Sequence, residues 1–413
     1  MEKVKVGVLG VQRGGEMIKF SKAYPKCELV AICDYWEEGL MKKKEELNDD
    51  RITYYLDFEE FLKHDMDAVV LANYATEHAP FAVKALKAGK NVFSECLPFQ
   101  TMKQAVELIE AVEETGKFYM YGENYCYYPA VREIKRDYDK GLLGEFEYGE
   151  GEYMHNCESI WPSITQGKPE HWRNNMYANF YCTHSMGPLV HITGMRPIKV
   201  VGFETPFNAR TARMGTKEGG IGVEMVTMEN GGVVKSLHGV GCSRNSVYYN
   251  FWASKGLEES TRECEERGAG IEIFKSLDEF EGENKGNKFE HFYPLDEFAE
   301  DAKTFGHGSS DYYCMKEFID YILGKEDADV INVYEACDMF LPGMFGYRSV
   351  LAGNVPLEIP NLRDKAVRDQ WRNDTWCTDP KVAGDMLVPS YSKGNPDIPQ
   401  EVYDNIKNKW LGK

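Results

Sequence analysis

The sequence predicts an α/β domain with a parallel sheet, followed by an α+β domain with an open, mainly antiparallel sheet. From residue 4 to about 122, apolar strands alternate with helical patterns, which is typical of a parallel sheet covered on both faces. After about residue 125, strands follow one another with few helices, and turn pairs such as Asn230-Gly231 join them. We therefore place the first domain at 1–125, the second at 126–360, and a C-terminal tail at 361–413 that packs on the body or on a partner subunit.

In the first domain we expect strands and helices in alternation, with the strands near 4–9, 29–33, 68–73, 91–94 and 118–121. The clearest helical patterns cover 76–88 and 101–115. A ligand of such a sheet binds at the carboxyl ends of the strands, where the strand order reverses.

In the second domain a helix is expected over 129–140, ending at Gly141. Strands follow near 145–155, 198–205, 221–229, 232–240, 247–254 and 270–274, and residues 279–287 read as an exposed loop. Two further helices are expected at 311–323 and 333–351. The tail is polar but carries three tryptophans, so we expect it to cover another surface.

The composition excludes several classes of protein. The formal net charge of −19 argues against nucleic-acid or anionic-membrane binding, because both need concentrated lysine and arginine. No apolar run is long enough to span a bilayer, and the N-terminus lacks a signal-peptide pattern. The 11 cysteines are scattered, without a C-x-x-C pair, and read as reduced packing thiols of a cytoplasmic protein. No His or Asp spacing supports a metal site.

The first strand turns into a helix through glycines, and the second strand ends in an acid. Gly10, Gly14 and Gly15 allow a backbone to approach a pyrophosphate at a helix N-terminus, and Asp34 is placed to accept the ribose hydroxyls. The pattern is imperfect, because Gln12 stands where the second glycine of G-x-G-x-x-G is usual. Strand, turn, helix and terminal acid together predict a Rossmann domain with a nicotinamide cofactor. An acid at position 34 would repel a 2′-phosphate, so NAD is favoured over NADP.

These residues, together with the segment Ala88-Gly-Lys-Asn-Val-Phe-Ser-Glu95-Cys-Leu-Pro98, resemble the Gfo/Idh/MocA family of NAD(P)-dependent oxidoreductases over about residues 1–360. The family motif after the fifth strand is usually E-K-P, and its lysine helps to move a hydroxyl proton. Cys96 stands at the lysine position here. A neutral thiol cannot replace an ammonium of depressed pKa, so the proton relay of the usual dehydrogenase is not expected.

Three more segments resemble the NAD-dependent α-N-acetylgalactosaminidases within this family, whose members also lack that lysine. They are Glu123-Asn-Tyr125, Tyr181-Cys-Thr-His184-Ser-Met-Gly187-Pro188 and Gly306-His307-Gly308-Ser-Ser-Asp311. The resemblance implies glycoside hydrolysis by transient oxidation at C3, deprotonation at C2 with elimination, addition of water, and re-reduction.

The resemblance and the strand topology imply three sets of site residues. The expected catalytic residues are Tyr181, His184 and His307. The expected cofactor contacts are Gly10, Gln12, Arg13, Gly14, Asp34, Asn73, His78, Glu95 and Asn124. The expected substrate contacts are Tyr128, His155, Trp172, Arg173 and Asp311. Members of the family commonly pair through the open sheet, which implies a homo-oligomer.

Ordinary structural roles compete with several of these assignments. Tyr181 and His184 could be a packed phenol and a histidine bonded to a carbonyl, and Asp311 could simply lie in the first turn of a helix. Two alternative functions also remain open from the sequence. One is an NAD-dependent sugar or cyclitol dehydrogenase with an altered relay, and the other is a sensor that kept the fold without activity.

Overall fold

The computed structural model describes residues 3–262, 273–279, 286–294 and 298–413. Within these residues the chain forms two compact units. Unit 1 comprises 1–127, 297–337 and 362–374, and unit 2 comprises 128–296, 338–361 and 375–413.

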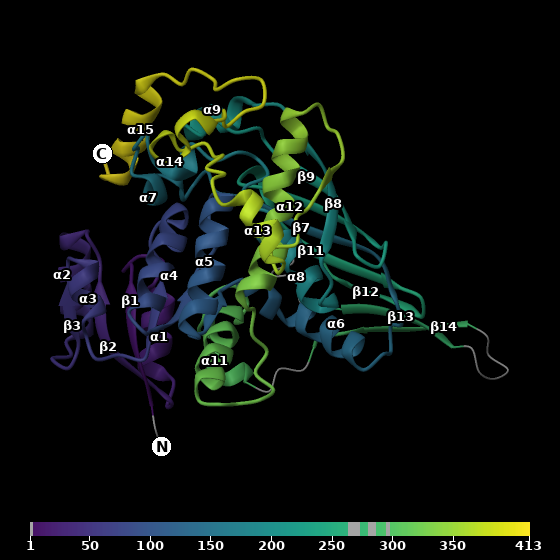
Figure 1. Ribbon diagram of the computed structural model, residues 1–413, viewed down its shortest axis with the longest axis horizontal. Helices are drawn as coiled ribbons and strands as arrows, with labels where there is room; N and C mark the ends of the chain where they lie inside the picture. Colours follow the sequence, from purple (N-terminus) through teal and green to yellow (C-terminus); the bar gives the residue numbers. More distant parts are fainter. Residues whose placement is uncertain (1–2, 263–272, 280–285, 295–297) are drawn as a thin grey trace. The chain divides into compact units, whose positions relative to one another are not determined.

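Unit 1 is built on a parallel six-stranded sheet with the order β3-β2-β1-β4-β5-β6. Figure 1 labels its strands β1, β2 and β3. Its strands are β1 (Val4–Leu9), β2 (Cys27–Cys33), β3 (Thr53–Tyr55), β4 (Ala68–Leu71), β5 (Asn91–Ser94) and β6 (Tyr119–Tyr121). Strands β1, β2, β4, β5 and β6 are almost entirely buried, as the continuous apolar runs predict, whereas the edge strand β3 is exposed or half-buried. The order reverses between β1 and β4, so their carboxyl ends form the switch point at which such sheets bind ligands.

Helices connect these strands. They are α1 (Gly15–Ala23), α2 (Glu37–Leu47), α3 (Phe58–Leu62), η1 (Ala75–Glu77), α4 (His78–Lys87), α5 (Met102–Thr115) and η2 (Asn124–Tyr127). Thr101 caps α5 by accepting from the Gln104 N–H, and Gly116 ends the helix at φ 62°. The parallel sheet and its crossover helices confirm the predicted Rossmann architecture.

Two later segments return to unit 1. They contain α10 (Ala299–Ala302), α11 (Ser310–Ile322), the first residues of α12 (Val333–Leu351), and α13 (Lys365–Trp371). Arg368 and Arg372 hold α13 on α5 through bidentate ion pairs with Glu113 and Glu110. Each unit is therefore assembled from segments that are not contiguous in the chain.

Unit 2 is built on a nine-stranded mixed sheet with the order β14-β13-β12-β11-β7-β10-β9-β8-β15. Its strands are β7 (Phe146–Asn156), β8 (Pro197–Glu204), β9 (Gly222–Met228), β10 (Val233–Gly239), β11 (Gly241–Ala253), β12 (Gly256–Ser260), β13 (Ile273–Glu279), β14 (Gly286–Phe292) and β15 (Leu357–Glu358). All neighbouring pairs are antiparallel except β7 with β10, which confirms the predicted, mainly antiparallel sheet.

The helices of unit 2 are α6 (Pro129–Asp139), α7 (Trp161–Thr165), η3 (Trp172–Asn174), α8 (Thr183–Thr193), α9 (Ala209–Met214), most of α12, α14 (Pro380–Ala383), η4 (Gly384–Met386) and α15 (Gln400–Trp410). α8 packs on β7 and β10 (Figure 1). This close approach needs a glycine, because a Cβ at Gly151 would lie 1.7 Å from the Ser185 carbonyl oxygen. The opposite face of the sheet carries partly exposed Phe203, Met225 and Trp252.

Sequence patterns missed the short edge strands β3 and β15, the hairpin strands β12 and β14, and helix α8, whose glycine and proline obscure the helical pattern. The predicted strand at 270–274 begins outside the described residues, and most of the predicted loop at 279–287 also lies outside them. In the described part of the chain, no helix has the length and apolarity required to cross a membrane.

Candidate functional site

The glycine turn after β1 has the shape of a phosphate cradle. Gly10 has φ 101°, and a Cβ there would lie 2.5 Å from the Ala72 carbonyl oxygen. A Cβ at Gly14 would lie 2.0 Å from the Gly10 carbonyl oxygen, whereas one at Gly15 would meet nothing within 4 Å. Backbone geometry therefore requires glycine at positions 10 and 14. Gln12 and Arg13 lie on the same turn, at the N-terminal end of α1, where unpaired amides favour an anion.

Asp34 is fixed beside this turn. Its carboxylate accepts hydrogen bonds from the N–H groups of Val11 and Trp36, each at 2.8 Å, and only 9% of the residue is exposed. A carboxylate has about four acceptor positions, so each oxygen keeps one for a ribose hydroxyl. The two hydrogen bonds fix the orientation of the Asp34 carboxylate at the end of β2.

A second group of predicted residues gathers around Asp311 at the start of α11. The Asp311 carboxylate accepts from Arg13 Nη1 (3.2 Å) and Nη2 (2.9 Å), Asn124 Nδ2 (2.8 Å) and His307 Nδ1 (2.9 Å). Glu95, at the end of β5, pairs with Arg13 Nη2 at 2.7 Å.

This arrangement changes the role that we predicted for Asp311. Four donors fill the acceptor positions of one carboxylate, and the side chain is 1% exposed, so none remains for a sugar hydroxyl. Burial alone raises the pKa of Asp311, but the His307 hydrogen bond and the Arg13 charge outweigh it and hold that pKa well below its usual range. Asp311 is thus a buried anion that orients Arg13, Asn124 and His307.

His307 has φ 52° and lies in edge contact with Tyr125, with ring centroids 5.9 Å apart. Because Nδ1 is bonded to Asp311, the other ring nitrogen is the one that could exchange a proton. The side chain is 38% exposed, so a ligand can reach it.

Asn73 and His78 follow β4, but their environments differ from a pair of simple cofactor ligands. His78 is 1% exposed, and its nitrogens face the Leu97 carbonyl at 2.8 Å and the Asn73 carbonyl at 3.2 Å. Burial lowers the pKa of His78 to about 4, so the ring is neutral near pH 7. A neutral ring carries one N–H, so His78 donates to one of these two carbonyls, and either bond supports the segments that follow β4 and β5. Asn73 keeps a buried Oδ1 without a hydrogen-bond partner among the described residues.

Cys96, at the position of the usual lysine, is a neutral thiol. Its Sγ lies 3.3 Å from Glu123 Oε2, and burial followed by the charges of Glu123 and Glu95 raises the Cys96 pKa well above its usual value. The thiol therefore donates to Glu123 and cannot supply the positive charge of an ammonium.

The predicted catalytic pair of unit 2 lies at the N-terminal end of α8. The rings of Tyr181 and His184 meet edge to face with centroids 5.0 Å apart, and the Tyr249 hydroxyl donates to the His184 carbonyl at 2.5 Å. Tyr153 of β7 packs still closer to His184, at 4.5 Å. The sequence prediction missed Tyr153, although it follows Gly149 and Gly151 on the same strand face.

Two further predicted substrate residues, Trp172 and Arg173, lie beside Tyr181. Trp172 stacks near Tyr181 at 6.5 Å, and the Arg173 guanidinium lies 4.4 Å from the Trp172 ring and 5.2 Å from the Tyr181 ring. His155 is in ring contact with Tyr153, and its Nδ1 lies 3.2 Å from the Cys157 sulfur. Tyr128 is buried immediately before α6.

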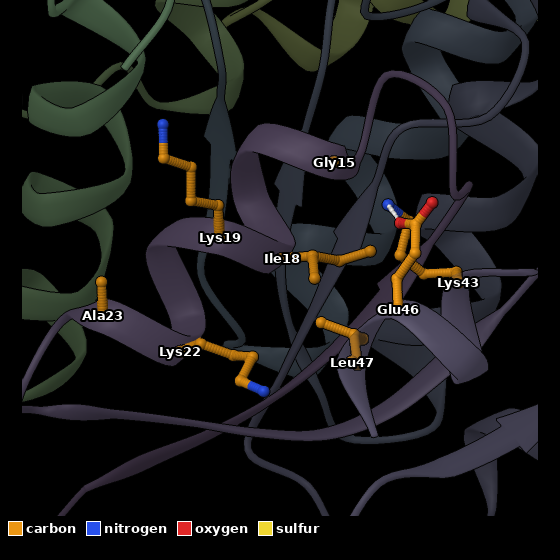
Figure 2. Close-up of a pocket in the computed structure, with 8 residues that line it drawn as sticks. All are labelled: Gly15, Ile18, Lys19, Lys22, Ala23, Lys43, Glu46 and Leu47. Carbon is orange, nitrogen blue, oxygen red and sulfur yellow. Dashed lines mark hydrogen bonds and ion pairs between the residues drawn. The ribbon is translucent and has the colours of Figure 1, made fainter. Parts of the chain in front are cut away.

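An open groove of about 380 Å³ between α1 and α2 contains none of the predicted cofactor residues. Figure 2 shows Lys19, Lys22 and Lys43 on its walls. Lys22 and Lys43 pair with Asp49 and Glu46, so these charges are compensated.

Two regions of the chain, one N-terminal and one C-terminal, each match a known protein family. Residues 4–123 match the oxidoreductase family with an NAD-binding Rossmann fold, and residues 200–372 match the glycosyl hydrolase 109 C-terminal domain. A glycosyl hydrolase family 109 protein of Solibacter usitatus is 28% identical over 89% of both chains. Another from Saccharopolyspora erythraea is 24% identical over 90% of this chain and 85% of its own length.

Solved structures share the fold at low sequence identity. A levoglucosan dehydrogenase in complex with NADH and L-sorbose gives a TM-score of 0.70 at 16% identity, covering 87% of this chain and 100% of its own. A myo-inositol 2-dehydrogenase from Lactobacillus plantarum gives 0.66 at 18% identity, with the same coverage. The cofactor is NAD, and the chain combines an N-terminal domain similar to the Gfo/Idh/MocA oxidoreductases with a C-terminal region similar to that of glycosyl hydrolase family 109.

Proposed function

We propose that this enzyme hydrolyses glycosides by transient oxidation of the sugar at C3, with no net consumption of NAD. The observation that carries the proposal is the presence of an NAD-binding domain and a glycosyl hydrolase 109 domain on one chain. The neutral Cys96 supports it, because a simple dehydrogenase of this family uses a lysine at that position.

The residues of unit 1 fit the cofactor. The Gly10 and Gly14 positions leave room for a pyrophosphate that a Cβ would block, and Asp34 keeps one acceptor position on each oxygen for the ribose. We assign the nicotinamide ribose to Asn73 and the carboxamide end to Asn124 and Glu95. When bound, NAD supplies the reversible two-electron oxidation of the sugar alcohol at C3.

Tyr181 and His184 supply the proton transfers. A ketone at C3 makes the proton at C2 acidic, and the side chain acting as base takes that proton. The C2–H electron pair then forms the C1–C2 double bond as the C1–O bond breaks, and the second side chain protonates the departing oxygen. Water adds at C1 by the reverse proton transfers. Each transfer by a positioned group is worth about 10²–10⁴-fold in rate.

His307 completes the set of titratable groups. Asp311 fixes its Nδ1, which directs the remaining nitrogen to substrate, and we assign His307 to the hydroxyl that is oxidised. Trp172, Arg173, His155 and Tyr128 are assigned to recognition of the glycoside, since an aromatic face and a guanidinium both suit a pyranose with hydroxyl groups.

A panel of nitrophenyl glycosides tests the proposal. Aglycone release and NADH absorbance are followed together, and the product is examined by NMR after reaction in deuterated water. We expect aglycone release without net NADH, and deuterium at C2. Stoichiometric NADH from a free sugar would instead establish the alternative function, a sugar or cyclitol dehydrogenase. Cleavage without C2 exchange would remove the elimination mechanism.

We also infer a homo-oligomer and a cytoplasmic location. The exposed faces of Phe203, Met225 and Trp252 on the sheet of unit 2 support pairing through that face. Ten cysteines of the described residues are free and buried, which suits a reducing compartment. Light scattering of the wild type and Trp252→Glu tests the first inference, since the substitution should reduce the assembly.

A further inference from the structure

A group of buried polar side chains lies on the inner face of the nine-stranded sheet. Glu224 of β9 and Ser236 of β10 are directly opposite each other, and His238 follows on the same face of β10. Glu224 and Ser236 are fully buried, and His238 is 1% exposed. The next inward positions of the two strands are Val226 and Val234, so this polar group borders an apolar part of the same face.

These groups contact the segment that precedes α8 and its first turn. Asn179 Nδ2 donates to Glu224 Oε1 at 2.6 Å, and His238 Nδ1 lies 3.5 Å from Glu224 Oε2. Ser185 Oγ lies 2.8 Å from Ser236 Oγ and 3.4 Å from His238 Nδ1. The polar group therefore ties down both ends of residues 179–185, and Tyr181 and His184 lie between the two attachments.

We propose that Glu224 is a positioning residue for Tyr181 and His184: as a proton-bearing acid, it joins Asn179 to the Ser236–Ser185–His238 group and fixes the segment between them. The proposal rests on the proposed function for the roles of Tyr181 and His184. The hydrogen-bonded anchor, by which we mean Asn179, Ser185, Glu224, Ser236 and His238, is independent of that function.

The surroundings explain why the acid keeps its proton. Its titratable neighbour is His238, which lies in turn near His184; in the part of the chain that is described, no lysine or arginine pairs with Glu224. From α12, a Cβ at Gly346 would lie 3.0 Å from Glu224 Cγ, so the helix closes over the carboxyl. Burial raises the pKa of Glu224 to about 8 and lowers that of His238 to about 3, so both are neutral near pH 7.

Ionisation of Glu224 is thus coupled to the anchor. The pKa of this carboxyl is higher in the folded than in the unfolded protein, so its contribution to stability is complete below about pH 4.5 and is lost as the pH rises toward 8. A glutamine keeps the shape, one acceptor and a donor, but cannot ionise.

The test compares Glu224→Gln, Glu224→Leu and the wild type. Melting temperature is measured from about pH 5 to about pH 9, together with hydrogen exchange of 179–185 and steady-state kinetics. We expect the melting temperature of Glu224→Gln to rise relative to wild type with increasing pH, with kcat kept within about threefold near pH 7. We expect Glu224→Leu to exchange faster in 179–185 and to lose about 100-fold in kcat, with NAD affinity unchanged.

Glu258→Gln is the matched control. Burial also raises the pKa of Glu258 to about 8, but this residue pairs with Lys275 in another part of unit 2. The control should share the pH-dependent gain in melting temperature without altering kcat or exchange in 179–185. The proposal would be overturned if the melting temperatures of Glu224→Gln and wild type changed equally with pH. Wild-type exchange rates in residues 179–185 of Glu224→Leu would overturn it as well. If Glu224→Leu does not fold, exchange in 179–185 of Glu224→Gln and of wild type at about pH 9 decides, because Glu224 ionises there only in the wild type and should then make this segment exchange faster. If no glycoside is cleaved, the melting and exchange results still decide the anchor, while the glycosidase function alone fails.

Discussion

Arg13 and Asp311 form a bidentate ion pair that joins the glycine turn after β1 to the first turn of α11. The two residues are far apart in the chain but belong to one unit. The same carboxylate holds the ring of His307, so one buried anion orients both a cofactor-turn residue and a candidate catalytic histidine.

Replacing Asp311 by Asn should therefore affect both stability and cofactor binding. The amide keeps the shape of the side chain but carries no negative charge to balance that of Arg13. Its NH2 group also replaces one accepting oxygen and would face the donors of neighbouring side chains. Breaking a buried pair in this way costs about 3 kcal/mol of unfolding free energy. Chemical denaturation measures the loss, and titration calorimetry should show weaker NAD binding. Asp301→Asn, an exposed change in α10, is the control, and equal stability of the two variants would contradict this role of Asp311.

The ion pair also predicts behaviour in acid. The pKa of Asp311 is depressed in the folded state, so its contribution to stability is complete above the unfolded value near 4 and is lost as the pH falls below it. The unfolding free energy of the wild type should decrease more steeply between about pH 4 and about pH 2 than that of Asp311→Asn. Urea unfolding at several pH values measures both slopes, and equal slopes would show that Asp311 titrates normally.

Gly10→Ala and Gly15→Ala form a matched pair on one turn. At position 10 a Cβ meets the Ala72 carbonyl and the backbone has a left-handed φ, so we expect a loss of about 1–3 kcal/mol and a much weaker NAD complex. At position 15 there is open space at the start of α1, so alanine should be neutral or stabilising by up to about 1 kcal/mol. Thermal melts with and without NAD distinguish the two. A tolerated Gly10→Ala would mean that the turn can move.

The Rossmann fold and its glycine turn were predictable from the sequence because they depend on local rules. A parallel strand ends at Leu9, a turn follows that only glycine can make at position 10, and the acid at the end of β2 lies at the same sheet edge. Each of these follows from periodicity and from one backbone restriction.

The contact of Asp311 with Arg13 and those of Glu224 could not be predicted in the same way, although the four-residue spacing of His307 and Asp311 did allow Asp311 to orient that ring. Asp311 fits the first turn of a helix whatever its partner, so nothing in the local pattern indicates Arg13. Glu224 did leave a signal, since alternation along β9 places it on the inner face, but only the structure identifies Asn179 and His238 as its partners. Long-range pairing of polar groups is specified by tertiary packing.

Cys96→Ala tests whether the thiol has a chemical role. Because its pKa is raised well above the usual value, Cys96 should remain protonated and unreactive toward iodoacetamide near pH 8. The alanine variant should keep kcat within about threefold, with a stability loss of about 1 kcal/mol for the lost contact with Glu123. Mass spectrometry of the labelled protein and steady-state kinetics check both statements. Rapid alkylation, or a large loss of kcat, would assign the thiol a part in the reaction.

Tyr181→Phe and His184→Ala should separate cofactor binding from turnover. Both side chains lie in unit 2, while the glycine turn and Asp34 lie in unit 1, so the affinity for NAD should stay within about twofold of wild type. Loss of a positioned proton-transfer group should lower kcat by about 10²–10⁴-fold. Deuterium exchange at C2 of the substrate identifies the base, because this exchange should stop only in the variant that lacks the base. Tyr293→Phe and His291→Ala, which change exposed residues near the end of β14, control for the chemistry of each substitution. Near-normal kcat in either Tyr181→Phe or His184→Ala would remove that residue from the mechanism, because deleting a required proton donor or acceptor must lower kcat by far more.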